Sequence, residues 1–189
     1  MTTNDPFGPL ADACRVAVAA LRDASVPFVL AGSFAAWAHG GPQPGKDLDF
    51  MVKPEDAEAA LAALVHAGMR AERPPEEWLF KAWRGDTMVD LIFGPAGLEM
   101  TDEILQRAQP IPVLAIETPV MALEDVLVTK LMALDEHALD YASLLGIARA
   151  CREQIDWTSL RRRTSASAYA QAFFALIEGL GITDAARLR

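Results

Sequence analysis

Three aspartates have the spacing of a site that holds a divalent cation. Asp47 and Asp49 are two residues apart in a segment, residues 47–52, that is typical of a β-strand, where alternate side chains point to the same face. Two carboxylates held close together repel unless a cation lies between them, and hard divalent cations prefer oxygen ligands. Asp90 lies within a second apolar strand segment, where an uncompensated charge would be costly. If the two strands are neighbours, three carboxylates converge.

A glycine and a serine upstream of the acids add an anion site to this pattern. Gly32-Ser33 follows a short apolar run, residues 28–31, and precedes a helix expected over residues 34–38 with Ser33 as its N-cap. Glycine lets the backbone come close to a ligand, and the free N–H groups of a helix N-terminus favour anions. Each feature alone also fits a plainer structure, a solvated strand end or an ordinary strand-to-helix turn. Together they predict a site for a Mg²⁺-bound polyphosphate.

Two lysines are candidates for contacting the phosphates. Lys130 falls in the middle of an apolar stripe on a helix expected over residues 120–134. Such a lysine either reaches the surface along its aliphatic stem or directs its charge at the phosphates. Lys46, directly before the acid pair, has the same two interpretations, a phosphate contact or a solvated loop charge. The stripe around Lys130 consists of Leu123, Val126, Leu127 and Leu134.

The order of these features resembles the DNA polymerase β-like nucleotidyltransferase superfamily. Its signature is hG[G/S], a short helix and loop, Dh[D/E], and a third acid, and it is matched by Gly32-Ser33, Asp47-Leu48-Asp49 and Asp90. Within the superfamily, residues 30–40 and 123–131 look similar to the minimal bacterial nucleotidyltransferases related to AbiEii-type toxins.

The resemblance covers about residues 26–145 and implies a reaction and a set of site residues. The reaction is transfer of a nucleoside monophosphate from a nucleoside triphosphate such as ATP to an acceptor hydroxyl, with release of pyrophosphate. Two Mg²⁺ ions, or Mn²⁺ in their place, would be bound by Asp47 and Asp49. Asp90 would complete the metal site and help to activate the acceptor hydroxyl. Gly32-Ser33 would hold the triphosphate.

A second motif of the relatives is only partly present. It has the form R-x-K-D-x-x-D, and Asp140 matches its first acid, while His137, Leu139 and Ser143 replace the arginine, the lysine and the second acid. The resemblance therefore implies nucleotide contacts from Asp140 and from Lys130, which matches a lysine of the preceding helix. The replaced positions favour an alternative, a non-catalytic nucleotide-binding or partner-binding module of a toxin–antitoxin pair. A third hypothesis is a metal-dependent phosphohydrolase built on the same acids.

The elements that position these residues are indicated by hydrophobic periodicity and turn residues. The sequence pattern changes at Thr118-Pro119 from a mixture of strands and helices to helices alone. The pattern predicts an α+β fold of the polymerase β-like type, a mixed β-sheet flanked by helices, with a catalytic core at 1–118 and a helical segment at 119–189 packed on it. The further expected elements are helices at 9–25, 54–68 and 102–108, a hairpin at 78–83 and 87–93, a strand at 111–116, and helices at 137–154 and 167–180.

Other polar and aromatic residues have plainer interpretations. Arg161-Arg162-Arg163 is expected to be a solvated helix face. His39, at the end of the short helix near the predicted triphosphate site, is a weaker ligand candidate. Trp78, Trp83 and Trp157 are expected in the core or at its rim.

The charge of the whole chain restricts the partners. Its 189 residues include 17 Lys and Arg against 26 Asp and Glu, a formal net charge of −9. Nucleic-acid backbones are usually held by basic surfaces, so this balance disfavours a nucleic-acid partner without excluding it. A cationic small molecule of aminoglycoside type suits an acidic protein as acceptor, while a tRNA 3′ end and a protein hydroxyl stay open. A toxin–antitoxin system would add a cognate partner protein.

Export and membrane contact are not expected. The N-terminal residues lack the basic start and apolar run of a signal peptide, and no run of about 18 uncharged apolar residues could span a bilayer. The two cysteines, Cys14 and Cys151, favour neither a disulfide framework nor a zinc site. The cytoplasm is the expected compartment.

Overall fold

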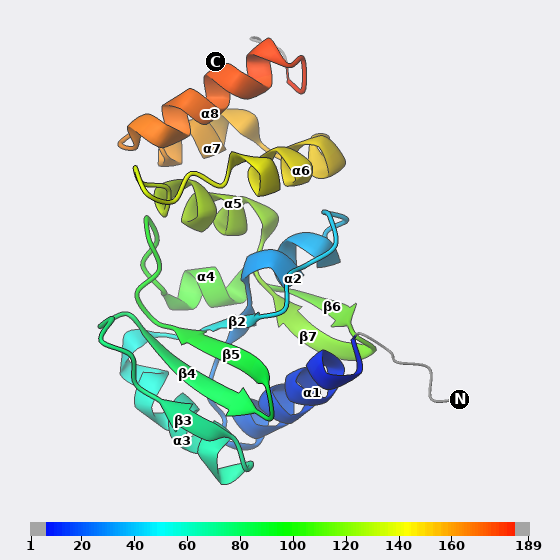
Figure 1. Ribbon diagram of the computed structural model, residues 1–189, viewed down its shortest axis with the longest axis vertical. Coiled ribbons are helices and arrows are strands. Elements are labelled where there is room, and N and C mark those ends of the chain that lie inside the picture. Colours follow the sequence, from blue (N-terminus) through cyan, green and yellow to red (C-terminus); the bar gives the residue numbers. More distant parts are fainter. Residues whose placement is uncertain (1–6, 184–189) are drawn as a thin grey trace.

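One seven-stranded mixed β-sheet organises the computed structural model, which describes residues 7–183 (Figure 1). The strands lie in the order β3-β4-β5-β2-β1-β7-β6. The pairs β2–β5 and β1–β7 are parallel and the others are antiparallel. A mixed sheet flanked by helices confirms the predicted fold class. The strands are β1 (Val29–Leu30), β2 (Leu48–Met51), β3 (Arg70–Glu72), β4 (Leu79–Arg84), β5 (Thr87–Ile92), β6 (Gln109–Val113) and β7 (Ile116–Val120).

Helices α1 (Gly8–Asp23) and α3 (Ala57–His66) pack against each other and against β5. The short turn η1 (Pro54–Asp56) leads into α3, so Pro54 begins the helical segment as its fixed φ favours. The periodicity predicted for the first helix is confirmed, because its apolar stripe is buried. That stripe consists of Leu10, Cys14, Val18 and Leu21.

The remaining helices form the other side of the molecule. Helix α2 (Gly32–Ala38) contacts β2 and α5 (Leu123–Met132). Figure 1 shows α5 at the base of a stack of helices at one end of the molecule, with α4 (Asp102–Gln106) between this stack and the sheet. The upper helices of the stack are α6 (Tyr141–Cys151), α7 (Trp157–Arg163) and α8 (Ala168–Gly179). No helix within the described residues is long and apolar enough to cross a membrane.

The predicted hairpin is present as β4 and β5, but two other predictions need correction and one strand was missed. The single strand expected at 111–116 is two strands, because Leu114 and Ala115 adopt positive φ and turn the chain between β6 and β7. The edge strand β3 was not predicted, and the helix expected at Arg161-Arg162-Arg163 is the separate helix α7. The helix expected from residue 137 begins only at Tyr141, since the Asp135 carboxylate accepts hydrogen bonds from two backbone N–H groups that follow it.

The division at residues 118 and 119 stays a prediction. Strand β7 runs from Ile116 to Val120 and so passes through this boundary. The outer ends of the two predicted segments, residues 1–6 and 184–189, lie outside the described residues.

Candidate active site

Two of the predicted acids lie side by side on neighbouring parallel strands. In the register of β2 and β5, Asp49 pairs with Asp90. Asp47 directly precedes β2 and is exposed, whereas Asp49 is partly buried. Because side chains alternate along a strand, Asp47 and Asp49 point to the same side. The strand pairing on which the predicted site depends is therefore present.

The electrostatics of Asp49 are those of a crowded carboxylate. Burial, followed by the negative charge of Asp90, raises the pKa of Asp49 to about 6. The positive charge of Lys130 opposes this rise, the charge of Asp47 adds to it, and a hydrogen bond from the backbone N–H of Ser33 opposes it. Burial is thus the main cause of the raised pKa of Asp49, and the neighbouring carboxylates add to it.

Asp90 is paired with a lysine. Lys81 lies opposite Asp90 in the β4–β5 hairpin, and its Nζ donates to Asp90 Oδ1 at 3.0 Å and contacts Met88 Sδ at 3.3 Å. Burial raises the pKa of Asp90, and the hydrogen bond from Lys81 opposes that rise. The sequence prediction missed Lys81. Counting the register back from the predicted turn at Gly85 would have placed it opposite Asp90.

Gly32 and Ser33 have different roles at the start of α2. Gly32 has φ +60°, and a Cβ there would lie 1.7 Å from Asp49 Oδ2, so only glycine fits beside this carboxylate. The predicted N-cap role of Ser33 is wrong, because α2 already begins at Gly32. Instead Ser33 Oγ accepts a hydrogen bond from the backbone N–H of Gly45 at 3.2 Å. Ser33 thereby ties the loop before the acid pair to the first turn of α2.

A cleft of about 470 Å³ opens beside Asp49. Thr129 and Lys130 of α5 form part of its wall, and apolar side chains that include Trp78 form most of the rest. Lys130 is partly buried, and its side chain makes no hydrogen bond or ion pair with any residue in the range 7–183. Its charge is therefore free to meet an anion in the cleft.

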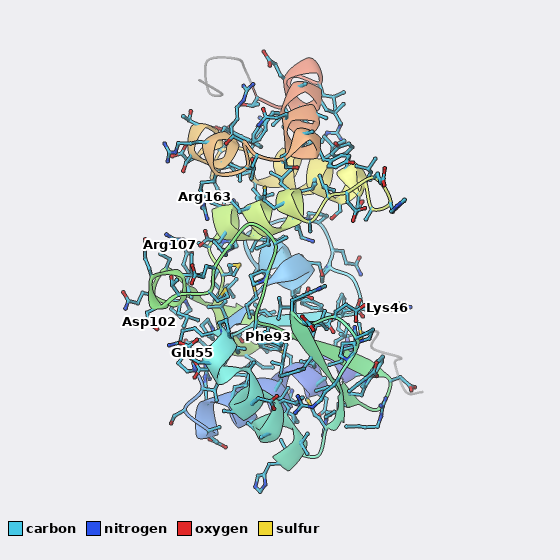
Figure 2. The ribbon with its side chains drawn as sticks, turned by 90° about the vertical axis from the view of Figure 1, so that its left-hand side faces the viewer. Lys46, Glu55, Phe93, Asp102, Arg107 and Arg163 are labelled. Atoms are coloured by element: carbon cyan, nitrogen blue, oxygen red, sulfur yellow. The ribbon has the colours of Figure 1, made fainter. Side chains whose placement is uncertain are left out.

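Lys130 also lines a second cavity of about 210 Å³, together with Asp140 and Ser143. The carboxylate of Asp140 accepts a hydrogen bond from the backbone N–H of Ser143 at 3.1 Å and caps α6. The structure thus brings Asp140 to the same cavity as Lys130 and gives it a helix-capping role. Lys46 is exposed, does not line either cavity, and lies on the side of the molecule opposite Arg107 and Arg163 (Figure 2).

The three acids have the oxygen donors that a divalent cation prefers, but their side chains are not gathered around one point in this structure. Among residues 7–183, no three His, Cys, Asp or Glu side chains lie close enough together to hold a metal ion. Asp90 directs Oδ1 at Lys81, and Asp47 is exposed. The donor set is nevertheless all carboxylate, and the pKa of Asp49 is raised first by burial and then by the negative charge of Asp90. Lys81 contacts Asp90 through Oδ1, and carboxylate oxygens are the ligands that a hard cation prefers, so these residues fit such a cation in chemistry.

A buried carboxylate, Asp125, joins the stack of helices to the rest of the molecule. Asp125 is 1% exposed; Arg107 Nη2 donates to both of its carboxylate oxygens at 3.0 and 2.9 Å, and Arg163 pairs with it as well. Figure 2 shows these two arginines on the same side of the molecule. The expectation of a fully solvated Arg161-Arg162-Arg163 face is therefore wrong for Arg163. Sequence reasoning missed this cluster because its three members are far apart in the chain.

His39 has a structural role in place of the ligand role considered for it. His39 Nε2 lies 2.9 Å from the carbonyl oxygen of Met121, and the carbonyl of His39 accepts hydrogen bonds from Gln154 Nε2 and Cys151 Sγ. These contacts connect the end of α2 to β7 and α6.

Solved structures with the same fold are antibiotic nucleotidyltransferases. The crystal structure of ANT(2")-Ia in complex with adenylyl-2"-tobramycin has a TM-score of 0.57 at 15% identity, covering 88% of this chain and 98% of that chain. The solution structure of antibiotic-resistance factor ANT(2")-Ia has a TM-score of 0.52 at 16% identity, with coverage of 91% and 92%. The lincosamide antibiotic adenylyltransferase LnuA, bound to lincomycin, has a TM-score of 0.50 at 10% identity, with coverage of 72% and 92%. At these identities the likeness is one of fold.

Sequence comparison identifies the family. No curated protein matches the sequence. Residues 35–179, from helix α2 to the end of α8, match a protein family described as "Uncharacterised nucleotidyltransferase". The chain therefore belongs to this nucleotidyltransferase family and has the polymerase β-like nucleotidyltransferase fold.

Proposed function

We propose that the protein transfers a nucleoside monophosphate from a nucleoside triphosphate to an acceptor hydroxyl. The observation that carries this proposal is the pairing of Asp49 with Asp90 beneath Gly32, on the wall of a cleft that also contains Lys130. Two partly buried like charges, beside a lysine that has no ion-pair partner among residues 7–183, have a clear use in a site for a metal-bound polyphosphate. The family match supports the same class of reaction.

The triphosphate would lie over the start of α2. Ser33 holds the loop that carries Lys46, and this loop leads into the first residue of β2. Ser33 and Lys46 would therefore contact the β- and γ-phosphates. Lys130 faces Asp49 from the other wall of the cleft and would contact the α-phosphate region. Asp140, in the cavity that Lys130 also lines, would contact the nucleoside. The helical segment 119–189 would thus supply part of the nucleotide site.

The chemical step is an in-line displacement at the α-phosphorus. The acceptor oxygen forms a bond to phosphorus, the bond from phosphorus to the α,β-bridging oxygen breaks, and pyrophosphate leaves with the electron pair. Asp90 is placed to accept the proton of the acceptor hydroxyl. Mg²⁺ or Mn²⁺, which Asp47, Asp49 and Asp90 would hold, supplies neutralisation of the phosphate charge when bound. Lys81 contacts Asp90 through Oδ1, so Asp90 would take either role through Oδ2, or through both oxygens once this ion pair opens.

The alternative, a non-catalytic module of a toxin–antitoxin pair, has one specific observation in its favour. Asp140, the single match in the second motif, already has a hydrogen-bond partner in the backbone of α6. A relation to AbiEii-type toxins and the presence of a partner protein stay predictions. The two acids on neighbouring strands favour catalysis over this alternative, because a module without metal has no use for their mutual repulsion.

The experiment that tests the proposal measures the product released from ATP. The protein is incubated with Mg²⁺, α-labelled ATP and a fractionated pool of hydroxylated metabolites and antibiotics, and pyrophosphate and labelled acceptor are quantified. We expect equal amounts of the two products, and no reaction after Asp49→Asn or Asp90→Asn. Release of inorganic phosphate would instead identify a phosphohydrolase. ATP binding that does not depend on Mg²⁺, without either product, would support the module.

Lys130 provides a second measurement. Lys130→Met keeps most of the apolar bulk and removes the charge, so it should weaken the binding of ATP and of AMP, which share the α-phosphate, at least tenfold. Arg84→Met, a charge removal on β4 outside both cavities, is the matched control and should leave both affinities unchanged.

A further inference from the structure

Trp78 presents an aromatic surface to the cleft beside the acids. Its side chain is 46% exposed, and it lines the cleft of about 470 Å³. Trp83 and Trp157 each donate the ring N–H to a protein acceptor, whereas the described part of the chain offers no acceptor to Trp78. A large ring with a free donor in a cleft is typical of a ligand-binding surface.

The backbone at Trp78 is held in place without a ligand. The carbonyl oxygen of Trp78 accepts hydrogen bonds from the N–H groups of Phe93 at 3.0 Å and Gly94 at 3.1 Å. A Cβ at Gly94 would lie 2.9 Å from Trp78 Cβ, so the absence of a side chain there allows this close approach. The position of Trp78 is thus fixed by the end of the strand that carries Asp90. Such fixing lowers the entropic cost of binding a ligand on the ring.

The acids and the apolar part of the cleft follow one another along the same two strands. Asp49 and Met51 share a face of β2, and in the register with β5 they pair with Asp90 and Ile92. Met51, Ile92 and Trp78 line the cleft. The acids therefore lie between this apolar end and the loop that Ser33 holds.

The geometry of phosphoryl transfer assigns this apolar end to one substrate. The attacking oxygen, the α-phosphorus and the leaving oxygen lie in line, so the acceptor reaches the phosphorus from the side opposite the leaving pyrophosphate. With the pyrophosphate at the loop of Ser33 and Lys46, the acceptor enters across Asp49 from the side of Trp78. The nucleoside is left with the second cavity, which Lys130 and Asp140 line.

The charge of the cleft restricts the acceptor further. Asp49 is the one carboxylate among the lining residues, and Lys130 in the same wall offsets its charge. Asp90 is paired with Lys81. A polycation needs several unpaired carboxylates, and this wall does not offer them. The net charge of −9 therefore lies elsewhere than in this cleft.

We infer that the cleft between Asp49 and Trp78 binds the acceptor, and that the acceptor is a hydroxyl compound that presents a planar or apolar face to Trp78 and carries at most one positive charge. This inference rests on the proposed function, which supplies the direction of attack.

The test compares the binding of three probes in the presence of Mg²⁺ and a non-hydrolysable ATP analogue. One probe carries an aromatic ring, one is its counterpart without the ring, and one is a polycation. Phenyl β-D-glucopyranoside should quench tryptophan fluorescence and bind at least fivefold more tightly than methyl β-D-glucopyranoside, because one aromatic contact contributes roughly this much or more. Tobramycin should not compete. In titration calorimetry, which does not need the Trp78 fluorescence, Trp78→Ala should abolish the preference for the phenyl compound, while Trp78→Phe should retain it within threefold. Trp83→Phe, a ring change outside the cleft, should leave quenching and preference intact.

Three results would overturn the inference. The first is equal affinity for the two glucosides, or binding of neither. The second is competition by tobramycin at comparable affinity. The third is a Trp78→Ala protein that loses affinity for the ATP analogue, which would make Trp78 a nucleobase platform. Probe binding needs no turnover, so a failure of the proposed function would show separately, as absence of pyrophosphate release with every acceptor.

Discussion

Gly32 leaves room for the carboxylate of Asp49. A Cβ on Gly32 would lie 1.7 Å from Asp49 Oδ2, and the residue adopts φ +60°. Two physical reasons therefore require glycine at this position of the signature. The backbone conformation is one that other residues avoid, and the carboxylate of Asp49 occupies the space that a side chain would need. The glycine places the start of α2 directly against the acid.

Gly32→Ala should therefore disturb both the fold and the acid. Positive φ alone costs an alanine about 1 kcal/mol, and the overlap with Asp49 adds to this or displaces the carboxylate. We expect a lower free energy of unfolding and loss of Mg²⁺-dependent ATP binding. Gly85→Ala is the control, because Gly85 has φ +58° with open space around it. Equal losses in the two variants would show that the contact with Asp49 is unimportant.

Asp49→Asn should change how the stability of the metal-free protein depends on pH. Because the pKa of Asp49 is about 6 in the fold and 3.8 as its ordinary value, the folded state binds more protons than the unfolded state between these pH values. This group thus lowers the free energy of unfolding as pH rises from about 4 to about 6, by up to about 3 kcal/mol. Denaturant unfolding in EDTA should show Asp49→Asn more stable than the parent at pH 7 and similar to it at pH 4. A variant less stable than the parent at pH 7 would make Asp49 a scaffold residue.

Lys81→Met should make the acids more receptive to a metal. The change removes the 3.0 Å ion pair with Asp90 and leaves an apolar chain of similar length beside Met88. We expect a lower melting temperature without metal and a larger rise on adding Mn²⁺ than in the parent protein. Arg84→Met removes another cation of the same strand, paired with Asp12 away from the cleft, and should not change the response to Mn²⁺. An unchanged response in Lys81→Met would show that Lys81 does not compete with metal.

Arg163→Met should destabilise the fold because it leaves a buried carboxylate with one partner. Asp125 is 1% exposed, and after the change only Arg107 would neutralise it. Fully breaking a buried pair costs about 3–5 kcal/mol, so we expect about 2 kcal/mol here. Arg162→Met is the control, since the Arg162 side chain is exposed and its hydrogen bond within residues 7–183 is with Ser159 of the same helix. Similar unfolding midpoints for the two variants would reduce the cluster to a surface interaction.

Much of the fold is predictable because local patterns agree with it. The apolar spacing of α1, Pro54 before α3 and the turn at Gly85 each identify an element without knowledge of its neighbours. β3 escapes prediction because it is a short edge strand with exposed residues. The turn at Leu114 and Ala115 escapes because neither residue is typical of a positive φ.

The candidate site is predictable where its residues follow a motif and hidden where they meet through the fold. Gly32, Asp49 and Asp90 were found from type and spacing, since strand and turn geometry brings them together. Lys81 reaches the site because the register of β4 and β5 places it opposite Asp90, and Trp78 belongs to the site because its exposed ring lines the cleft. Neither property can be seen in composition or periodicity.

The measurement that tests the account most directly is a crystal structure with Mn²⁺ and α,β-methylene-ATP, located by anomalous scattering. We predict metal peaks at about 2.1 Å from carboxylate oxygens of Asp47 and Asp49, with Asp90 turned away from Lys81 and the terminal phosphates beside Ser33. Metal peaks away from Asp49, or a triphosphate bound outside the cleft that Lys130 lines, would contradict it.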